Sequence, residues 1–186
     1  MDGTSATGMA SNAPNMTRPD ASEYAPYYGK YIALVSGNDV VRALETQARE
    51  TTRIVAGISE SQGMHRYAPE KWSVKEVIGH LTDSERIFCY RALRIARGDQ
   101  TPIEGFEQDD YVRDAQFDRL PLSDLVAEFN VVRQATLRLF TSLQPDAWTR
   151  HGVANKNEVS VRALAYMIAG HELHHRHVLR EKYGVV

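Results

Sequence analysis

The residues best suited to chemistry in this sequence are histidines near its C-terminus. Four of the seven histidines in the 186-residue chain lie within residues 171–177. An apolar stripe at helical spacing runs toward them through Leu164 and Ile168. Further steps of three and four residues fall on His171 and His175, so both imidazoles are predicted to face the protein interior. Side chains one helical turn apart can direct ring nitrogens to one divalent ion, at about 2.0–2.1 Å from each nitrogen.

Two ligands hold a metal ion poorly, and His80 is the best candidate for a third. It lies three residues after Val77, on the flank of another apolar stripe in a segment that is predicted to form a separate helix. Three imidazoles would then converge inside the protein. A site with three neutral nitrogen ligands leaves coordination positions for water or substrate, which is the arrangement expected of a catalytic metal site.

The histidines also allow other interpretations. A pair four residues apart can form a hydrogen-bonded core pair or a partly exposed polar seam. Rotating the last helix by about 100° would bring His174 into the place of His175. Without that rotation His174 and His177 are expected on the flanks of the helix. His65 and His151 fall near predicted linkers and are expected at the surface.

A second group of candidates lies in a linker of some twenty residues, 99–120. Long loops in compact domains are frequently functional. Asp109, Asp110 and Tyr111 could supply a base or a substrate contact if this loop folds over the metal, although an acidic loop is commonly only solvated surface. Glu85 lies five residues after His80, which is about 140° around a helix, and is expected at the surface or behind the ligands.

Four segments with helical periodicity are predicted to position these residues. Ser73 and Glu76 form a capping box at the start of the second segment, and Ser160 can cap the last one. Gly184 is placed to end that last helix. No segment alternates convincingly with period two, so a β-sheet core is not expected. The sequence predicts an all-α, up-and-down-type four-helix bundle. The four segments are 38–59, 74–97, one that begins near residue 123, and 160–183.

Composition predicts one domain after a flexible tail. Residues 1–22 carry almost no large apolar side chains and are interpreted as the tail, which leaves 23–186 as the domain. The 22 basic and 24 acidic residues nearly cancel, which argues against a nucleic-acid partner. No apolar stretch approaches the roughly 20 residues needed to span a bilayer, and no secretory leader is evident. A cytoplasmic protein without membrane contact is therefore expected. The single cysteine, Cys89, is expected to serve packing.

Several segments of the chain resemble the DinB-like superfamily, and the resemblance extends over nearly everything after the tail. The fold implied by the resemblance is an up-and-down-type four-helix bundle. A histidine of the second helix and an H-x-x-x-H pair of the last helix are metal ligands in that family, and the pattern falls on His80, His171 and His175 of this sequence. Homodimers are common among such proteins. The segments that carry the resemblance are 24–35, 72–86, 105–112 and 162–175.

The resemblance implies a metal-dependent enzyme, either a thiol-dependent S-transferase or a hydrolase, with a small-molecule substrate and, in the first case, a low-molecular-weight thiol. Zinc or nickel is the expected ion, and iron or copper also suits imidazole ligands. The alternative is a non-catalytic, metal-stabilised binding or stress-response protein. An open coordination position beside a pocket would favour catalysis, whereas a closing fourth ligand such as Asp109 or His174 would favour the structural role. No P-loop, dinucleotide-binding, dithiol or serine-hydrolase motif competes with these hypotheses.

Overall fold

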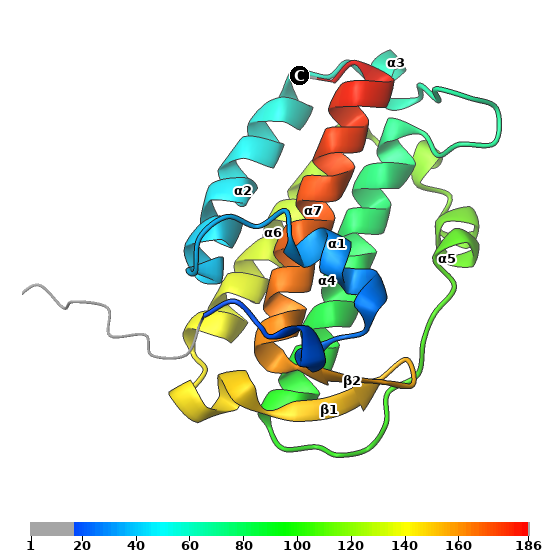
Figure 1. The fold of residues 1–186 in the computed structure, drawn as a ribbon. Helices are drawn as coiled ribbons and strands as arrows, with labels where there is room; N and C mark the ends of the chain where they lie inside the picture. The colour runs from blue at the N-terminus through cyan, green and yellow to red at the C-terminus, as the bar shows by residue number, and fades with distance from the viewer. Residues whose placement is uncertain (1–16, 186) are drawn as a thin grey trace, which may run out of the picture.

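The computed structural model describes residues 17–185 and is built on four long helices that lie side by side (Figure 1). This confirms the predicted four-helix bundle. Each long helix lies within a few residues of its predicted range, since apolar residues recur at helical spacing and capping residues mark the starts. The four are α2 (Val40–Ala56), α4 (Val74–Ala96), α6 (Leu122–Thr141) and α7 (Val161–Tyr183).

Within the bundle, α4 and α6 run in the same direction, and α2 and α7 run in the opposite one (Figure 1). Contacts at both ends of the bundle support these helix directions. The Ser73 hydroxyl at the start of α4 donates to Asp118, which stands shortly before α6, at 2.5 Å. At the other end, Arg150 donates to the carbonyl of Ala96, the last residue of α4. The connection 97–121 therefore travels back along the whole bundle.

That connection is more ordered than the sequence predicts. The segment 99–120 is expected to be an irregular linker, but it contains α5 (Gln108–Ala115) and a 3-10 helix, Phe117–Arg119. α5 buries one apolar side chain, Val112, so two turns of helix leave little periodicity to detect. The segment is held at one end by Ile103, whose backbone exchanges hydrogen bonds with Val153 and Asn155.

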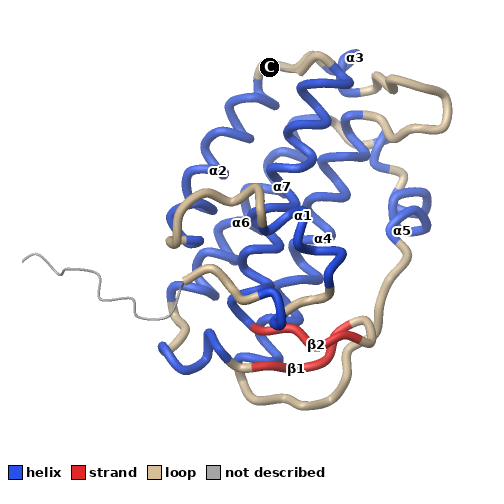
Figure 2. Tube along the Cα trace, viewed as in Figure 1, coloured by secondary structure: helices blue, strands red, loops and turns tan. Residues whose placement is uncertain are grey.

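A β-hairpin closes one end of the bundle, where the sequence predicts only a polar linker (Figure 2). β1 (His151–Ala154) pairs antiparallel with β2 (Asn157–Ser160). The two turn residues, Asn155 and Lys156, have φ values of 48° and 63°, which is the left-handed geometry of a tight hairpin turn. Strands of four residues are too short for alternation to stand out, so the polar turn alone marks them.

The N-terminal part of the domain packs across α7. Residues 1–16 of the predicted tail lie outside the described residues, but Arg18 already donates to the carbonyl of Ile32 at 2.7 Å. Glu23 accepts hydrogen bonds from Ser160 and from Arg162, each at 2.7 Å. The contact with the domain therefore begins before residue 23. The elements here are the 3-10 helices Ala21–Glu23 and Pro26–Tyr28 and the helix α1 (Gly29–Ile32). No helix of the described part of the chain is both long and apolar enough to cross a membrane.

A buried ion network crosses the bundle core. Arg133 of α6, which is 1% exposed, donates to both carboxylate oxygens of Glu85 of α4, at 2.8 and 2.7 Å. It also lies 2.7 Å from a carboxylate oxygen of Glu172 of α7. Thr51 of α2 donates to the other oxygen of that carboxylate. Of the two positions expected for Glu85, the surface is excluded, because the helical angle from His80 does not reveal this buried arginine partner.

Candidate metal centre

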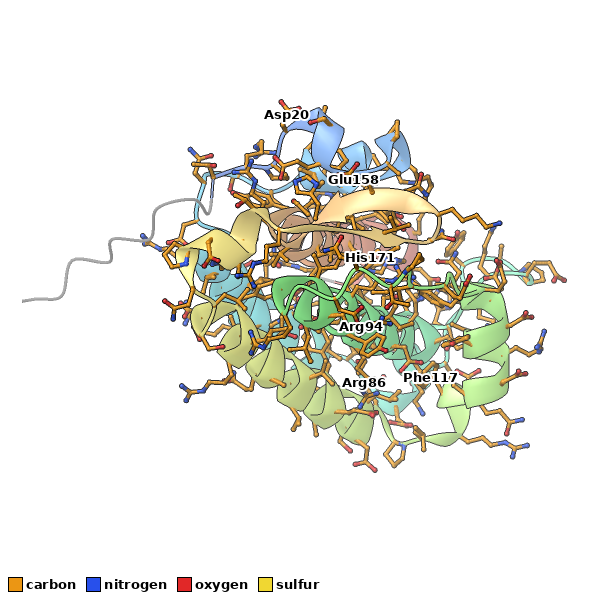
Figure 3. The ribbon with its side chains drawn as sticks, turned by 90° about the horizontal axis from the view of Figure 1, so that it is seen from below. Asp20, Arg86, Arg94, Phe117, Glu158 and His171 are labelled. Atoms are coloured by element: carbon orange, nitrogen blue, oxygen red, sulfur yellow. The ribbon has the colours of Figure 1, made fainter. Side chains whose placement is uncertain are left out.

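Two long helices supply the three histidines that the sequence singles out. His80 lies on α4, two turns after its capping box, and His171 and His175 lie on α7. α4 and α7 pack against one another over much of their length, and His80 and His171 are only 3% and 7% exposed. Figure 3 looks along the bundle from the hairpin end and shows His171 toward the interior, between the long helices.

The three rings meet through the same ring nitrogen. His171 Nε2 lies 3.1 Å from His80 Nε2 and 3.1 Å from His175 Nε2. One ligand atom from each of the three residues lies within 4.8 Å of the other two. The structure thus brings together the residues that the sequence nominates, and His175 rather than His174 completes the group.

Hydrogen bonding alone does not account for this arrangement. Nε2 of a neutral imidazole carries either one proton or one lone pair, so His171 can complete at most one linear hydrogen bond with its two neighbours. A shared ion fits the spacing better. Two nitrogens that are each about 2.1 Å from an ion lie about 3.0 Å apart for a right angle and about 3.4 Å apart for a tetrahedral one. The donor set and the separations both fit a divalent cation.

The histidines are held in the neutral form that metal binding requires. Burial lowers the pKa of His80 to about 4. Burial also lowers the pKa of His171 and of His175 well below the ordinary value, and the neighbouring histidines lower both further. At neutral pH the three lone pairs are therefore available without the loss of a proton.

Aromatic side chains enclose the three rings. Trp72, directly before α4, lies 4.6 Å from the His80 ring between centroids and stacks on His175 at 6.4 Å. Tyr31 of α1 meets the edge of His171 at 5.4 Å. His175 Nδ1 is buried and has no hydrogen-bond partner among the described residues. A low-dielectric surrounding of this kind strengthens electrostatic interactions at the centre.

A cleft of about 450 Å³ opens beside the histidines. His175 lines it directly, so this ligand candidate connects the buried group to the surface. Gln108 and Asp109 at the start of α5 also line the cleft. The volume lies within the usual range for small-molecule sites. The other lining residues are Tyr67, Glu70, Lys71, Trp72, Val77, His174, Val178 and Tyr183.

The three acidic and aromatic candidates of residues 109–111 separate in the structure. Asp109 lines the cleft. Asp110 is turned to Arg113, with which it forms an exposed ion pair at 2.5 Å. Tyr111 packs on Phe106 at 5.1 Å and does not line the cleft. These residues belong to a helix rather than to a loop, and helical geometry explains why neighbours in sequence point in different directions.

The other histidines lie outside the group of three. His174 packs on Tyr31 at 5.2 Å, at the edge of the cleft. His65 and His177 are exposed, and His151 of the hairpin lies 3.0 Å from the Glu158 carboxylate. Cys89 lies 3.1 Å from the Thr136 hydroxyl, and burial raises the pKa of its thiol to about 12. Such a thiol stays protonated at neutral pH, in accord with a packing role.

The sequence gives little sign of the residues that surround the histidines. Trp72 is recognisable only as the apolar residue before a capping box, and Tyr31 only as part of an aromatic lead-in to the domain. Their contacts with the histidines depend on tertiary packing between segments far apart in sequence.

Comparisons with known proteins give a family and a fold. A family model described as the DinB superfamily matches residues 43–179, which is most of the chain. No curated protein sequence matches the chain. Among solved structures, similarity extends over 92% of this chain and 99% of a Bacillus subtilis protein, YfiT, with a TM-score of 0.71 and 18% identity. That protein is described as a probable metal-dependent hydrolase with an unusual four-helix bundle topology.

A second similar structure is that of a mycothiol-dependent maleylpyruvate isomerase, with a TM-score of 0.67 and 13% identity. The alignment covers 83% of this chain but only 63% of the isomerase, so the isomerase has a further portion that this chain does not match. A variant of that isomerase with one histidine replaced by alanine gives a TM-score of 0.66. At these identities the likeness establishes the bundle fold.

Proposed function

This chain belongs to the DinB superfamily, and we propose that it is a metal-dependent enzyme acting on a small-molecule substrate, with a divalent ion held by His80, His171 and His175. One observation carries the proposal: three Nε2 atoms gather at the wall of a cleft, with separations of 3.1 Å along two sides of their triangle. Zinc or nickel is the ion we expect, since neutral imidazoles suit both.

The residues at this site have different proposed roles. The three neutral imidazoles hold and orient the ion. Tyr31 keeps water away from the buried His171 ring, and Trp72 packs on His80 and His175 and lines the cleft. A divalent cation at this place supplies the positive charge that makes a water or thiol nucleophilic at neutral pH. Asp109, which also lines the cleft, is the proposed acceptor for the proton that the nucleophile releases.

Hydrolysis is the leading reaction class. The similar structure that aligns over its full length is described as a probable metal-dependent hydrolase, and hydrolysis requires only water besides the substrate. Thiol transfer is the second candidate, supported by the likeness to a mycothiol-dependent isomerase and by a cleft of about 450 Å³ that has room for a small thiol beside its acceptor. We also propose a cytoplasmic homodimer that has no nucleic-acid or membrane partner.

A non-catalytic, structural ion is the main alternative. Closed structural sites usually have four protein ligands, whereas three histidines are the group found here among the described residues. The His80→Ala variant distinguishes a catalytic ion from a structural one when both its turnover and its thermal stability are measured. If the ion is catalytic, turnover falls at least about a hundredfold while the melting temperature changes by only a few degrees. A large fall in melting temperature with no metal-dependent reaction would favour the structural role.

The experiment that tests the proposal starts from untagged protein, stripped of metal and reloaded with zinc or with nickel. Rates are measured with simple esters and amides in water, and with a small thiol and an electrophile. We expect turnover that requires the ion and disappears in His171→Ala. His177→Ala is the matched control, because it removes a neighbouring imidazole that is exposed and does not line the cleft, and it should retain turnover. Equal loss in both variants, or turnover that is independent of the ion, would contradict the proposal.

A further inference from the structure

Three aromatic rings form one continuous wall of the cleft. Tyr67 and Tyr183 meet edge to face at 4.9 Å between ring centroids, and both line the cleft. The Tyr183 hydroxyl donates to the backbone carbonyl of Trp72 at 2.6 Å. Trp72 in turn packs on the rings of His80 and His175. These contacts connect the three aromatic residues and extend from the exposed Tyr67 to the histidines.

Other side chains that line the cleft are polar. α5 contributes Gln108 and Asp109, an amide and a carboxylate, and Glu70 and Lys71 line the cleft as well. The cleft therefore combines polar side chains with an aromatic wall that reaches the histidines through Trp72.

Two of the three rings also serve the core, because Trp72 and Tyr183 pack against a cluster of buried apolar residues. Tyr67, by contrast, is 39% exposed. Trp72 and Tyr183 are both half-buried, so each keeps an exposed part that borders the cleft. Flat rings with exposed faces favour planar, unsaturated ligands, because offset and edge-to-face ring pairs add attraction beyond the area they bury.

We propose that the wall formed by Tyr67, Trp72 and Tyr183 selects substrates with an aryl group adjacent to the reacting bond, such as arylmethyl esters. The inference rests on the proposed function for the identity of the reacting atom, but the binding preference itself does not depend on turnover. The aryl group packs on the wall, and the reacting bond lies beside His175.

Binding can be measured without a substitution in the chain, because its two tryptophans lie in different places and give separate signals. Trp72 lies at the cleft, whereas Trp148 is 3% exposed and packs on Phe140. The protein is labelled with 5-fluorotryptophan, its two fluorine resonances are assigned with Trp72→Phe, and benzyl alcohol and cyclohexylmethanol are titrated. These alcohols differ in aromaticity but hardly in size.

We expect benzyl alcohol to shift the Trp72 resonance and to leave that of Trp148 unchanged, with an affinity about three- to tenfold higher than that of cyclohexylmethanol. Equal affinities, or equal shifts of both resonances, would overturn the inference. The same titration on metal-free protein separates this result from the identity of the ion, since the wall is made of the chain's own residues.

Kinetics with the matched esters provide a second, independent readout. Trp72→Leu should raise KM for benzyl acetate about three- to tenfold, leave KM for cyclohexylmethyl acetate nearly unchanged, and be rescued by Trp72→Phe. Tyr90→Leu, which removes an exposed ring that does not line the cleft, is the control and should change neither KM. Equal changes for both esters would contradict aryl selection. Absence of metal-dependent hydrolysis with either ester would count against the proposed hydrolase, and the alcohol titration would still decide the binding preference.

Discussion

At the scale of single residues, the centre depends on three imidazoles in the interior, none of which has a carboxylate partner among the described residues. Burial disfavours a charged imidazole, and a second charge beside it would add repulsion. The rings therefore stay neutral, and their Nε2 atoms, 3.1 Å apart along two sides of the triangle, are available to an ion between them. The same feature that suits a cation makes the metal-free protein sensitive to acid.

That sensitivity gives a first prediction. The pKa of His80 is about 4 in the folded protein, against 6.5 for an unperturbed histidine, so the unfolded chain binds more protons between these values. Stability of the metal-free protein should fall as the pH drops from about 6.5 to 4, by about 3 kcal/mol from His80 alone. Urea unfolding at a series of pH values measures it. His80→Gln should flatten the slope, and an unchanged slope would show that His80 is not the group responsible.

A second prediction concerns metal content. His171 touches both other rings, so His171→Ala removes the central member and should reduce bound zinc from about one ion per chain to near zero. Circular dichroism should remain helical, because the apolar core of the bundle supplies most of the stability. Elemental analysis after dialysis measures the change. Metal content that persists at the level of the exposed control, His177→Ala, would place the ion elsewhere.

Periodicity in the sequence was sufficient to nominate the histidines. Following apolar residues along α4 and α7 by steps of three and four places His80, His171 and His175 inward without knowledge of the fold. The same reasoning does not reveal Trp72 or Tyr31, because their approach to the histidines is created by connections that cross the helices. Spacing identifies which face a residue occupies, but not which distant segment covers that face.

At the scale of elements, close backbone packing fixes α1 over the centre. A Cβ atom at Gly170 of α7 would lie 2.1 Å from the carbonyl oxygen of Tyr31, a distance at which the backbone must shift. Glycine is therefore required for α1 to approach α7 directly before His171. The contact holds the Tyr31 ring against that histidine.

Gly170→Ala should consequently push α1 away and destabilise the protein by about 1–3 kcal/mol. It should also weaken metal binding, because Tyr31 no longer holds the His171 ring. Chemical unfolding and zinc titration of the same variant measure the two effects. Gly57→Ala is the control, since a Cβ there meets its nearest atom at an ordinary 3.5 Å. Equal stability of the two variants would contradict the packing argument.

The elements differ in how well the sequence predicts them. α2, α4, α6 and α7 are long enough for apolar spacing to repeat several times, so their ranges were predicted closely. α5 buries a single apolar residue, and each hairpin strand has four residues, so neither repeats a pattern often enough. These short elements nevertheless determine the site and the topology, because α5 forms one side of the cleft.

At the scale of the whole molecule, the buried ion network joins all four long helices, and Glu172 directly follows His171 in sequence. Arg133 of α6 pairs with Glu85 and Glu172, and Thr51 of α2 bonds to Glu172. Removing one member of a buried network leaves the others charged and without partners. The network therefore fixes how the helices sit relative to one another, and with them the two helices that carry the histidines.

Arg133→Met should destabilise the protein by about 3–5 kcal/mol, because two buried carboxylates lose their cation. Arg86→Met is the matched control. Its ion pair with Glu128 is at the surface, and its loss should cost less than about 1 kcal/mol. Urea unfolding of both variants at neutral pH measures the difference. Similar costs for the two variants would show that the buried network adds no more than a surface pair.

The most direct test of the central claim, that His80, His171 and His175 together hold one divalent ion, is a crystal structure of zinc-loaded protein with data collected on both sides of the zinc absorption edge. We expect one anomalous peak per chain, at about 2.0–2.1 Å from the Nε2 atom of each of the three histidines. A peak bound by other residues, or three rings that turn apart with no peak between them, would contradict the account.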